Sequence, residues 1–284
     1  MELEYTAPGD PYYDFCLWEY EPAAPQEDKI RSVNLLFQSF AVAALDQKAF
    51  RLVESLRQGI GVFNTVYGVK QIGGRLAWEF YFYDYRRRNR ERSIASVLRA
   101  IRPFAPCSVR PNENLNYFMF SLDIDQDLLV GNREIEEMHM YIGAPGSTVS
   151  SAFCFAISPG GTRLENYYFF YRSEQIQEIM NKIAGSAQVD TSVIDMNNII
   201  WPQLRDCEII VIANKQQNDA IYFSRIKVDQ LIFFMKTLRY PQLLIDFIEQ
   251  NREKLNHLLY DVGFDYRMEG RDLVILKSGY YGVF

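Results

Sequence analysis

Ala220-Ile221-Tyr222-Phe223-Ser224-Arg225-Ile226 alternates as a β-strand directly after the turn residues Gln217-Asn218-Asp219. Helical patterns follow over Val228 to Arg239 and over Pro241 to Tyr260, and a closing pair of strands ends at Tyr280-Tyr281-Gly282-Val283-Phe284. This strand–helix–helix–strand unit, from Asn218 to Phe284, decides the fold that we expect. Its aromatic strands predict the walls of a pocket. The unit contains no catalytic signature.

The chain of 284 residues is 48% hydrophobic and 23% charged, so it can bury a sizeable core. Tyrosine is unusually common, with 19 Tyr beside 20 Phe. Because a buried tyrosine hydroxyl needs a hydrogen-bond partner, many tyrosines on strands indicate an amphipathic lining. A tyrosine-rich sheet with one solvated face is the alternative.

The net charge of −6 argues against a general nucleic-acid-binding protein. The four cysteines are widely spaced and form no metal or redox motif, and no His/Asp/Glu cluster has metal-ligand spacing. We find no signal-peptide pattern and no apolar stretch near the roughly 20 residues of a membrane helix. The sequence therefore predicts a cytoplasmic protein with no membrane partner, as a monomer or weak dimer.

The first half of the chain predicts an irregular arm followed by strand pairs. Residues 1–29 are rich in proline and aromatic residues, and we expect them to pack as an arm on a single body, 30–284. A helix is expected from Ile30 to Gln58 with Gly59 as its stop, then strands over 62–71 and 75–85 and a helix over 93–101. The basic run Arg86-Arg87-Arg88, Arg90 and Arg92 predicts either an anion or acidic-peptide site or a solvated loop.

The second half continues the pattern. Strands are expected over 115–124, 136–143, 152–158, 163–172 and 207–214, with a helix from Ser173 to about Ala184 and a polar loop over 185–206. Strand pairs separated by helices indicate an α+β fold. About ten antiparallel strands tend to close, and such a barrel is wider than the roughly eight strands that side chains fill alone. We therefore predict an αββα barrel with outer helices and room for a ligand.

Four stretches carry a family resemblance: Phe120–Asp125 through Glu137–Met140, Phe153–Tyr171, Lys215–Asn218 into Ile221–Phe223, and Asp272–Lys277. In their spacing and in the pattern of residue types along their strands, they resemble the ABBA-barrel aromatic prenyltransferases. The nearest likeness is to the cyanobactin-type peptide prenyltransferases. The resemblance covers most of residues 60–284. It implies transfer of a dimethylallyl- or geranyl-type group from an isoprenoid diphosphate to a peptide or small aromatic acceptor, as in natural product biosynthesis of RiPP peptides.

The resemblance also implies site residues. The side chains expected to bind the diphosphate are the cations Arg75, Lys215 and Lys277, with His139 as a hydrogen-bond donor. Mg²⁺ is expected to bind through the diphosphate. Glu79 and Glu137 are the candidate bases, although the family pattern expects an Arg near Glu79 and a Lys at Glu137, which leaves the diphosphate site short of positive charge. The candidate pocket for the prenyl group and acceptor consists of Tyr117, Tyr141, Tyr167, Tyr222 and Ser224.

Each candidate also has a structural interpretation. The cations can be solvated strand ends, His139 a hydrogen-bonded structural histidine and the tyrosines core residues. The rival function is a non-catalytic barrel that binds a hydrophobic ligand or peptide, which missing inner cations would favour. A third possibility is an interaction domain with a filled core.

Overall fold

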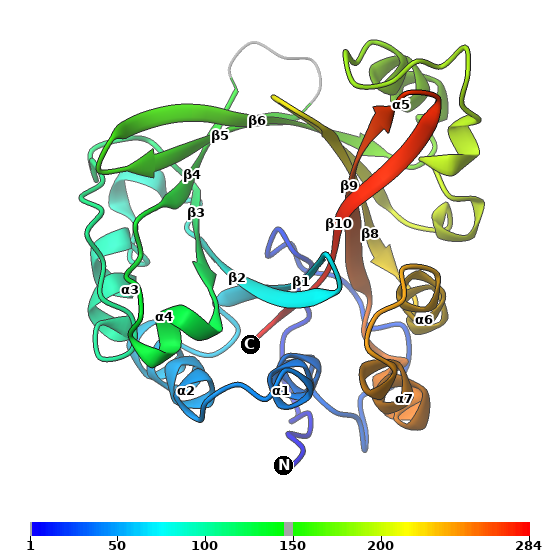
Figure 1. Cartoon of the computed structure of the whole chain (residues 1–284). Helices are drawn as coiled ribbons and strands as arrows, with labels where there is room; N and C mark the ends of the chain where they lie inside the picture. The colour runs from blue at the N-terminus through cyan, green and yellow to red at the C-terminus, as the bar shows by residue number, and fades with distance from the viewer. Residues whose placement is uncertain (1, 145–149) are drawn as a thin grey trace.

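A computed structural model describes residues 2–144 and 150–284, and ten antiparallel strands in it form one closed barrel (Figure 1). The strands are β1 (Thr65–Ile72), β2 (Arg75–Tyr83), β3 (Met119–Ile124), β4 (Met138–Gly143), β5 (Ser151–Ser158), β6 (Gly161–Arg172), β7 (Ile209–Lys215), β8 (Asp219–Ile226), β9 (Tyr260–Glu269) and β10 (Asp272–Val283). Each strand pairs with its neighbour in the chain, and β1 pairs with β10 to close the ring. The predicted ten-stranded barrel is confirmed.

The helices lie outside the ring of strands, as the view along the barrel shows (Figure 1). They are α1 (Val33–Val42), α2 (Lys48–Ile60), α3 (Ile94–Ile101), α4 (Gln126–Val130), α5 (Ile176–Ala184), α6 (Val228–Thr237), α7 (Gln242–Gln250) and α8 (Arg252–Leu255). Helices bury much of the outer strand surface: Trp78 of β2 is buried against α1, where its indole N–H donates to Ser39 Oγ at 2.7 Å. The outer faces of β5 and β6 stay partly exposed. This arrangement leaves the inner faces free to carry polar groups.

No helix in the described part of the chain is long and apolar enough to cross a membrane.

The long helix predicted over Ile30 to Gln58 is two helices, α1 and α2. The break falls at 43–47, where Ala44 has a φ of 52°, a conformation that ends a right-handed helix. Gly59 is not the stop, because α2 continues to Ile60. Gly61 ends it instead with a φ of 90°, which a residue with a β-carbon rarely adopts.

The second long helix, predicted over Pro241 to Tyr260, is also wrong in extent. The side chain of Asn251 donates to the Phe247 carbonyl at 2.9 Å where α7 ends, and α8 stops at Leu255. Tyr260 already belongs to β9. His257 was expected inside this helix but lies in the connection before β9, where it is buried against the Tyr12 ring. The short helix α4 was not predicted.

The arm of residues 2–29 contains no helix or extended strand, only isolated bridges such as Tyr13 to Glu19. The turn between these two residues lies across one end of the barrel. Phe15 there stacks on Tyr222 with ring centroids 6.3 Å apart, and its backbone N–H donates to the Asp261 carboxylate at 2.8 Å. The arm therefore forms one wall of the space inside the barrel.

Candidate functional site

Five tyrosines, one from each even-numbered strand, form a ring inside the barrel. They line both of the cavities found there, and we call them the tyrosine ring. Each faces a small residue on an adjacent strand: Tyr81 faces Ser121, Tyr141 faces Cys154, Tyr168 faces Ala213, Tyr222 faces Gly263, and Tyr281 faces Gly68. This alternation of large and small residues lets five rings share one level of the barrel.

On one side of the ring is a cavity of about 560 Å³, which we call the polar chamber. Its charged lining consists of the cations Lys70, Arg163, Lys215 and Lys277 and the acids Glu79, Asp123, Glu165 and Asp265, with His139 beside them. Among the described lining residues the two signs are thus equal in number. The resemblance led us to expect a diphosphate site short of positive charge. The chamber does contain lysines, but an equal number of acids balances its cations.

Lys70 and Glu79 form a buried ion pair at the edge of the tyrosine ring. Lys70 Nζ also lies 2.9 Å from the Asp123 carboxylate, and the Tyr81 hydroxyl donates to Glu79 at 2.7 Å. Burial opposes both charges, but the pair overcomes it: Lys70 and His139 hold the pKa of Glu79 well below its usual range, and the two carboxylates raise the pKa of Lys70. Glu79 therefore stays ionised, which makes it a weak base in this state.

A second ionic cluster contains Lys215, Lys277 and Asp265. Lys215 Nζ lies 2.6 Å from the Asp265 carboxylate and Lys277 Nζ lies 3.4 Å from the same oxygen. One carboxylate is thus shared by two ammonium groups. Burial, and next the charge of Lys215, lower the pKa of Lys277. An anion entering the chamber would stabilise the charged form of Lys277.

His139 lies between the two predicted bases. Its Nδ1 is 3.8 Å from Glu79 and its Nε2 is 3.7 Å from Glu137. Glu137 itself is at the outer rim, where it pairs with Arg163 at 3.5 Å and lines a different surface hollow. Of the two, only Glu79 faces the tyrosine ring.

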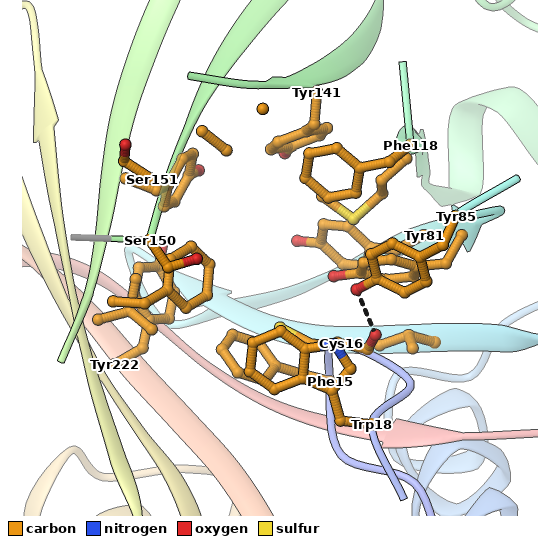
Figure 2. A pocket seen from close by; sticks show the side chains of 18 of the residues that line it. Phe15, Cys16, Trp18, Tyr81, Tyr85, Phe118, Tyr141, Ser150, Ser151 and Tyr222 are labelled. Atoms are coloured by element: carbon orange, nitrogen blue, oxygen red, sulfur yellow. Dashed lines mark hydrogen bonds between the residues drawn. The ribbon is translucent and has the colours of Figure 1, made fainter. Parts of the chain in front are cut away.

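On the other side of the ring is a cavity of about 210 Å³, which we call the aromatic chamber. Aromatic rings make most of its wall, and Figure 2 shows Tyr81, Tyr85 and Phe118 across from Tyr222. Phe15, Cys16 and Trp18 of the arm complete the wall, and the Tyr85 hydroxyl donates to the Cys16 carbonyl at 2.7 Å. Trp18 and Tyr85 are 38% and 46% exposed, so they mark the mouth.

The structure brings six predicted residues together around the polar chamber: Glu79, His139, Tyr141, Lys215, Tyr222 and Lys277. Of the other five, Glu137 lies at the outer rim as described above, and four lie elsewhere. Arg75 is at the exposed turn between β1 and β2 and lines an outer surface hollow. Tyr117 is under α3, where its hydroxyl accepts from the Ile94 N–H.

Tyr167 points outward and stacks on Phe153 with centroids 4.5 Å apart, because it alternates with the inward Tyr168. Ser224 is buried at the end of the barrel that the arm covers, where it donates to Asp261, and it lines neither chamber. Arg75, Tyr117, Tyr167 and Ser224 are therefore corrections to the predicted site.

Sequence reasoning missed Lys70 and three members of the ring, Tyr81, Tyr168 and Tyr281. A signal for Tyr81 was present, since Glu79 and Tyr81 are two residues apart and must share a strand face. Lys70 carried no such signal, because its partners come from other strands.

Within the described residues, no group of three or more His, Cys, Asp or Glu side chains could hold a metal ion. No family model matches the chain, and no curated protein matches it in sequence. The two chambers and the tyrosine ring are therefore the features from which a function can be inferred.

Proposed function

We propose that this barrel transfers a dimethylallyl- or geranyl-type group from its diphosphate to a peptide or small aromatic acceptor. One observation carries the proposal: Lys70, Lys215 and Lys277 line a chamber that borders directly on the tyrosine ring. Ammonium groups bind phosphate oxygens, and aromatic faces stabilise a carbocation and exclude water from it. The likeness of the strand pattern to the ABBA-barrel prenyltransferases supports the same chemistry.

In this proposal the diphosphate competes with carboxylates for the lysines. Lys277 is the most available of them, because Asp265 keeps its shorter contact with Lys215. His139 and Arg163 line the same chamber and add hydrogen-bond donors. The allylic tail then lies against the tyrosine ring and the acceptor approaches from the aromatic chamber.

The reaction breaks the bond between C1 of the allylic group and its phosphate oxygen, and the electron pair leaves with pyrophosphate. The acceptor's nucleophilic atom forms the new bond to C1 and releases a proton. Glu79 takes this proton. A diphosphate that draws Lys70 away from Glu79 would remove the main charge that lowers the pKa of Glu79, so donor binding makes Glu79 a better base.

Mg²⁺ belongs to the donor in this proposal. The described residues supply no three-ligand metal site, whereas Mg²⁺ is commonly held by one or two carboxylates together with substrate phosphates. No step of the reaction above is assigned to the metal.

A non-catalytic barrel that binds a hydrophobic ligand or peptide is the second candidate. It is favoured by the equal numbers of cations and acids in the polar chamber, because a trianionic headgroup gains less from lysines that already face carboxylates. The aromatic chamber alone would serve such a binding protein.

The two candidates differ in what they bind. Thermal unfolding is measured with dimethylallyl diphosphate, geranyl diphosphate, inorganic pyrophosphate or geraniol, each with Mg²⁺ or EDTA. Prenyl transfer predicts that the diphosphates raise the Tm, equivalent to about 2.7 kcal/mol at a hundredfold excess over Kd. Lys277→Met should abolish the shift. Tyr167→Ala, on the outer face, should keep it.

Product formation completes the test. Tyrosine- and tryptophan-containing peptides are incubated with each donor, and mass spectrometry looks for the added prenyl mass. A Tm shift with geraniol but none with either diphosphate, together with no product, would contradict prenyl transfer and favour the binding protein.

A further inference from the structure

Arg87 is the only charged residue among the described residues that line the aromatic chamber, and none of those residues is acidic. It is exposed at the mouth, in the company of Tyr85 and Phe118. A guanidinium group pairs well with planar carboxylates and also lies favourably against aromatic faces. The charge of this chamber is therefore suited to an anionic ligand group.

Hydrogen bonds to one buried side chain organise the loop that carries Arg87. The buried Asp84 carboxylate accepts from the backbone N–H groups of Arg86, Glu91 and Arg92 at 3.0, 2.7 and 3.1 Å. Burial opposes the charge of Asp84, but these hydrogen bonds lower its pKa. Arg87, at the tip, has a φ of 56°, which is unfavourable for a residue with a β-carbon. The surrounding contacts thus impose this conformation.

The other arginines of the run have different roles. Arg90 donates to the carbonyls of Glu113 and Leu115, and Arg92 donates to the Tyr83 carbonyl at 2.7 Å. Arg86 pairs with Glu91 on the surface. Arg88 is exposed and lines neither chamber, so it is a matched control for Arg87.

A second observation comes from the opposite wall. Ser150 and Ser151 lie across the chamber from Phe118 and Tyr85 (Figure 2). Ser151 Oγ is buried and has no hydrogen-bond partner among the described residues. Ser151 shares the outer face of β5 with Phe153, so its hydroxyl turns away from the chamber. The wall opposite Arg87 therefore carries small side chains and no acid that would compete with a ligand carboxylate.

We propose that the aromatic chamber selects a ligand whose aromatic ring carries a nearby carboxylate, and that Arg87 binds that carboxylate. Calling this ligand the acceptor rests on the proposed function. The carboxylate has two possible sources: a free aryl acid, or an acidic residue beside an aromatic residue in a peptide.

Two matched ligand pairs test the inference by calorimetry. The aryl-acid pair is N-acetyltryptophan and its amide, and the peptide pair is acetyl-Glu-Tyr-amide and acetyl-Gln-Tyr-amide. We expect the carboxylate member of at least one pair to bind about fivefold more tightly, as for an ion pair at a partly exposed site. The preferred pair identifies the source.

The variants decide whether Arg87 is responsible. Arg87→Met should remove the preference and leave the affinity for the neutral member unchanged, while Arg88→Met should keep the preference. Equal affinities within both pairs would overturn the inference, as would equal losses in the two variants. Neither titration uses an allylic donor. The calorimetry can therefore be interpreted even if no diphosphate raises the Tm.

Discussion

The polar and aromatic chambers share the tyrosine ring but satisfy their polar groups differently. In the polar chamber, Lys70 and Lys215 already contact carboxylates, so its charges are paired within the protein. In the aromatic chamber, Arg87 is the one charge among the described lining residues, and none of those residues is an acid that could pair with it. A ligand must displace contacts in the first chamber and supplies contacts in the second. The two halves of one barrel thus suit different kinds of ligand group.

Lys70→Met should have the largest effect on the polar chamber. It leaves the Glu79 carboxylate buried without its main counter-charge, which should lower the free energy of unfolding by about 3–5 kcal/mol. Lys277→Met should cost under about 1 kcal/mol, because Asp265 keeps Lys215. Urea unfolding measures both. Equal losses in the two variants would contradict the different roles given to these lysines.

Gly263→Ala tests the ring that separates the chambers. A β-carbon at Gly263 would lie 2.3 Å from Tyr222 Cδ1 and 2.8 Å from the Ile221 carbonyl oxygen, so the ring must move. We expect a loss of about 1–3 kcal/mol in urea unfolding and a weakened affinity for apolar ligands.

Gly279, which pairs with Gly263 across β9 and β10, is the control. A β-carbon there comes no closer than 3.4 Å, to the Tyr281 hydroxyl, and should be tolerated. If Gly279→Ala is as damaging as Gly263→Ala, crowding of Tyr222 is not the cause.

The end of the barrel that the arm covers should be sensitive to pH, because Asp261 is buried there beneath Phe15. Burial and the nearby Asp14 raise the pKa of Asp261 to about 8, against about 4 in an unfolded chain. Between these values the folded protein binds the extra proton, so stability falls as the pH rises towards 8. The slope should be about 1 kcal/mol per pH unit, seen in urea unfolding from pH 6 to 8.

The polar chamber should not share this dependence. Its carboxylates Glu79 and Asp265 have lowered pKa values, so their contribution is complete above the usual carboxyl range and is lost only in acid. Asp14→Asn should reduce the slope between pH 6 and 8, because it removes the charge that repels ionised Asp261. An unchanged slope in that variant would exclude Asp14 as a cause.

Several features of the site were predictable from local pattern. Alternation predicted that Tyr141 and His139 share a strand face, and both line the polar chamber. Tyr222, a candidate from the resemblance, lines it too. Tyr167 was expected from the family resemblance, and alternation alone does not tell which of the neighbours Tyr167 and Tyr168 faces inward. Arg75 was misjudged because a strand end gives no indication of whether it reaches the lumen or the solvent. Helix breaks at Ala44 and Asn251 were missed because neither residue is a strong breaker by type.

The sequence by itself determined the strand pairs, their antiparallel order and the abundance of tyrosine on them, because these depend on periodicity and on turns within a few residues. Only the tertiary structure decided that five tyrosines share one level and that Lys70 faces Glu79. The height of a side chain inside a barrel depends on the stagger accumulated over all ten strands, and no single stretch of sequence contains that sum.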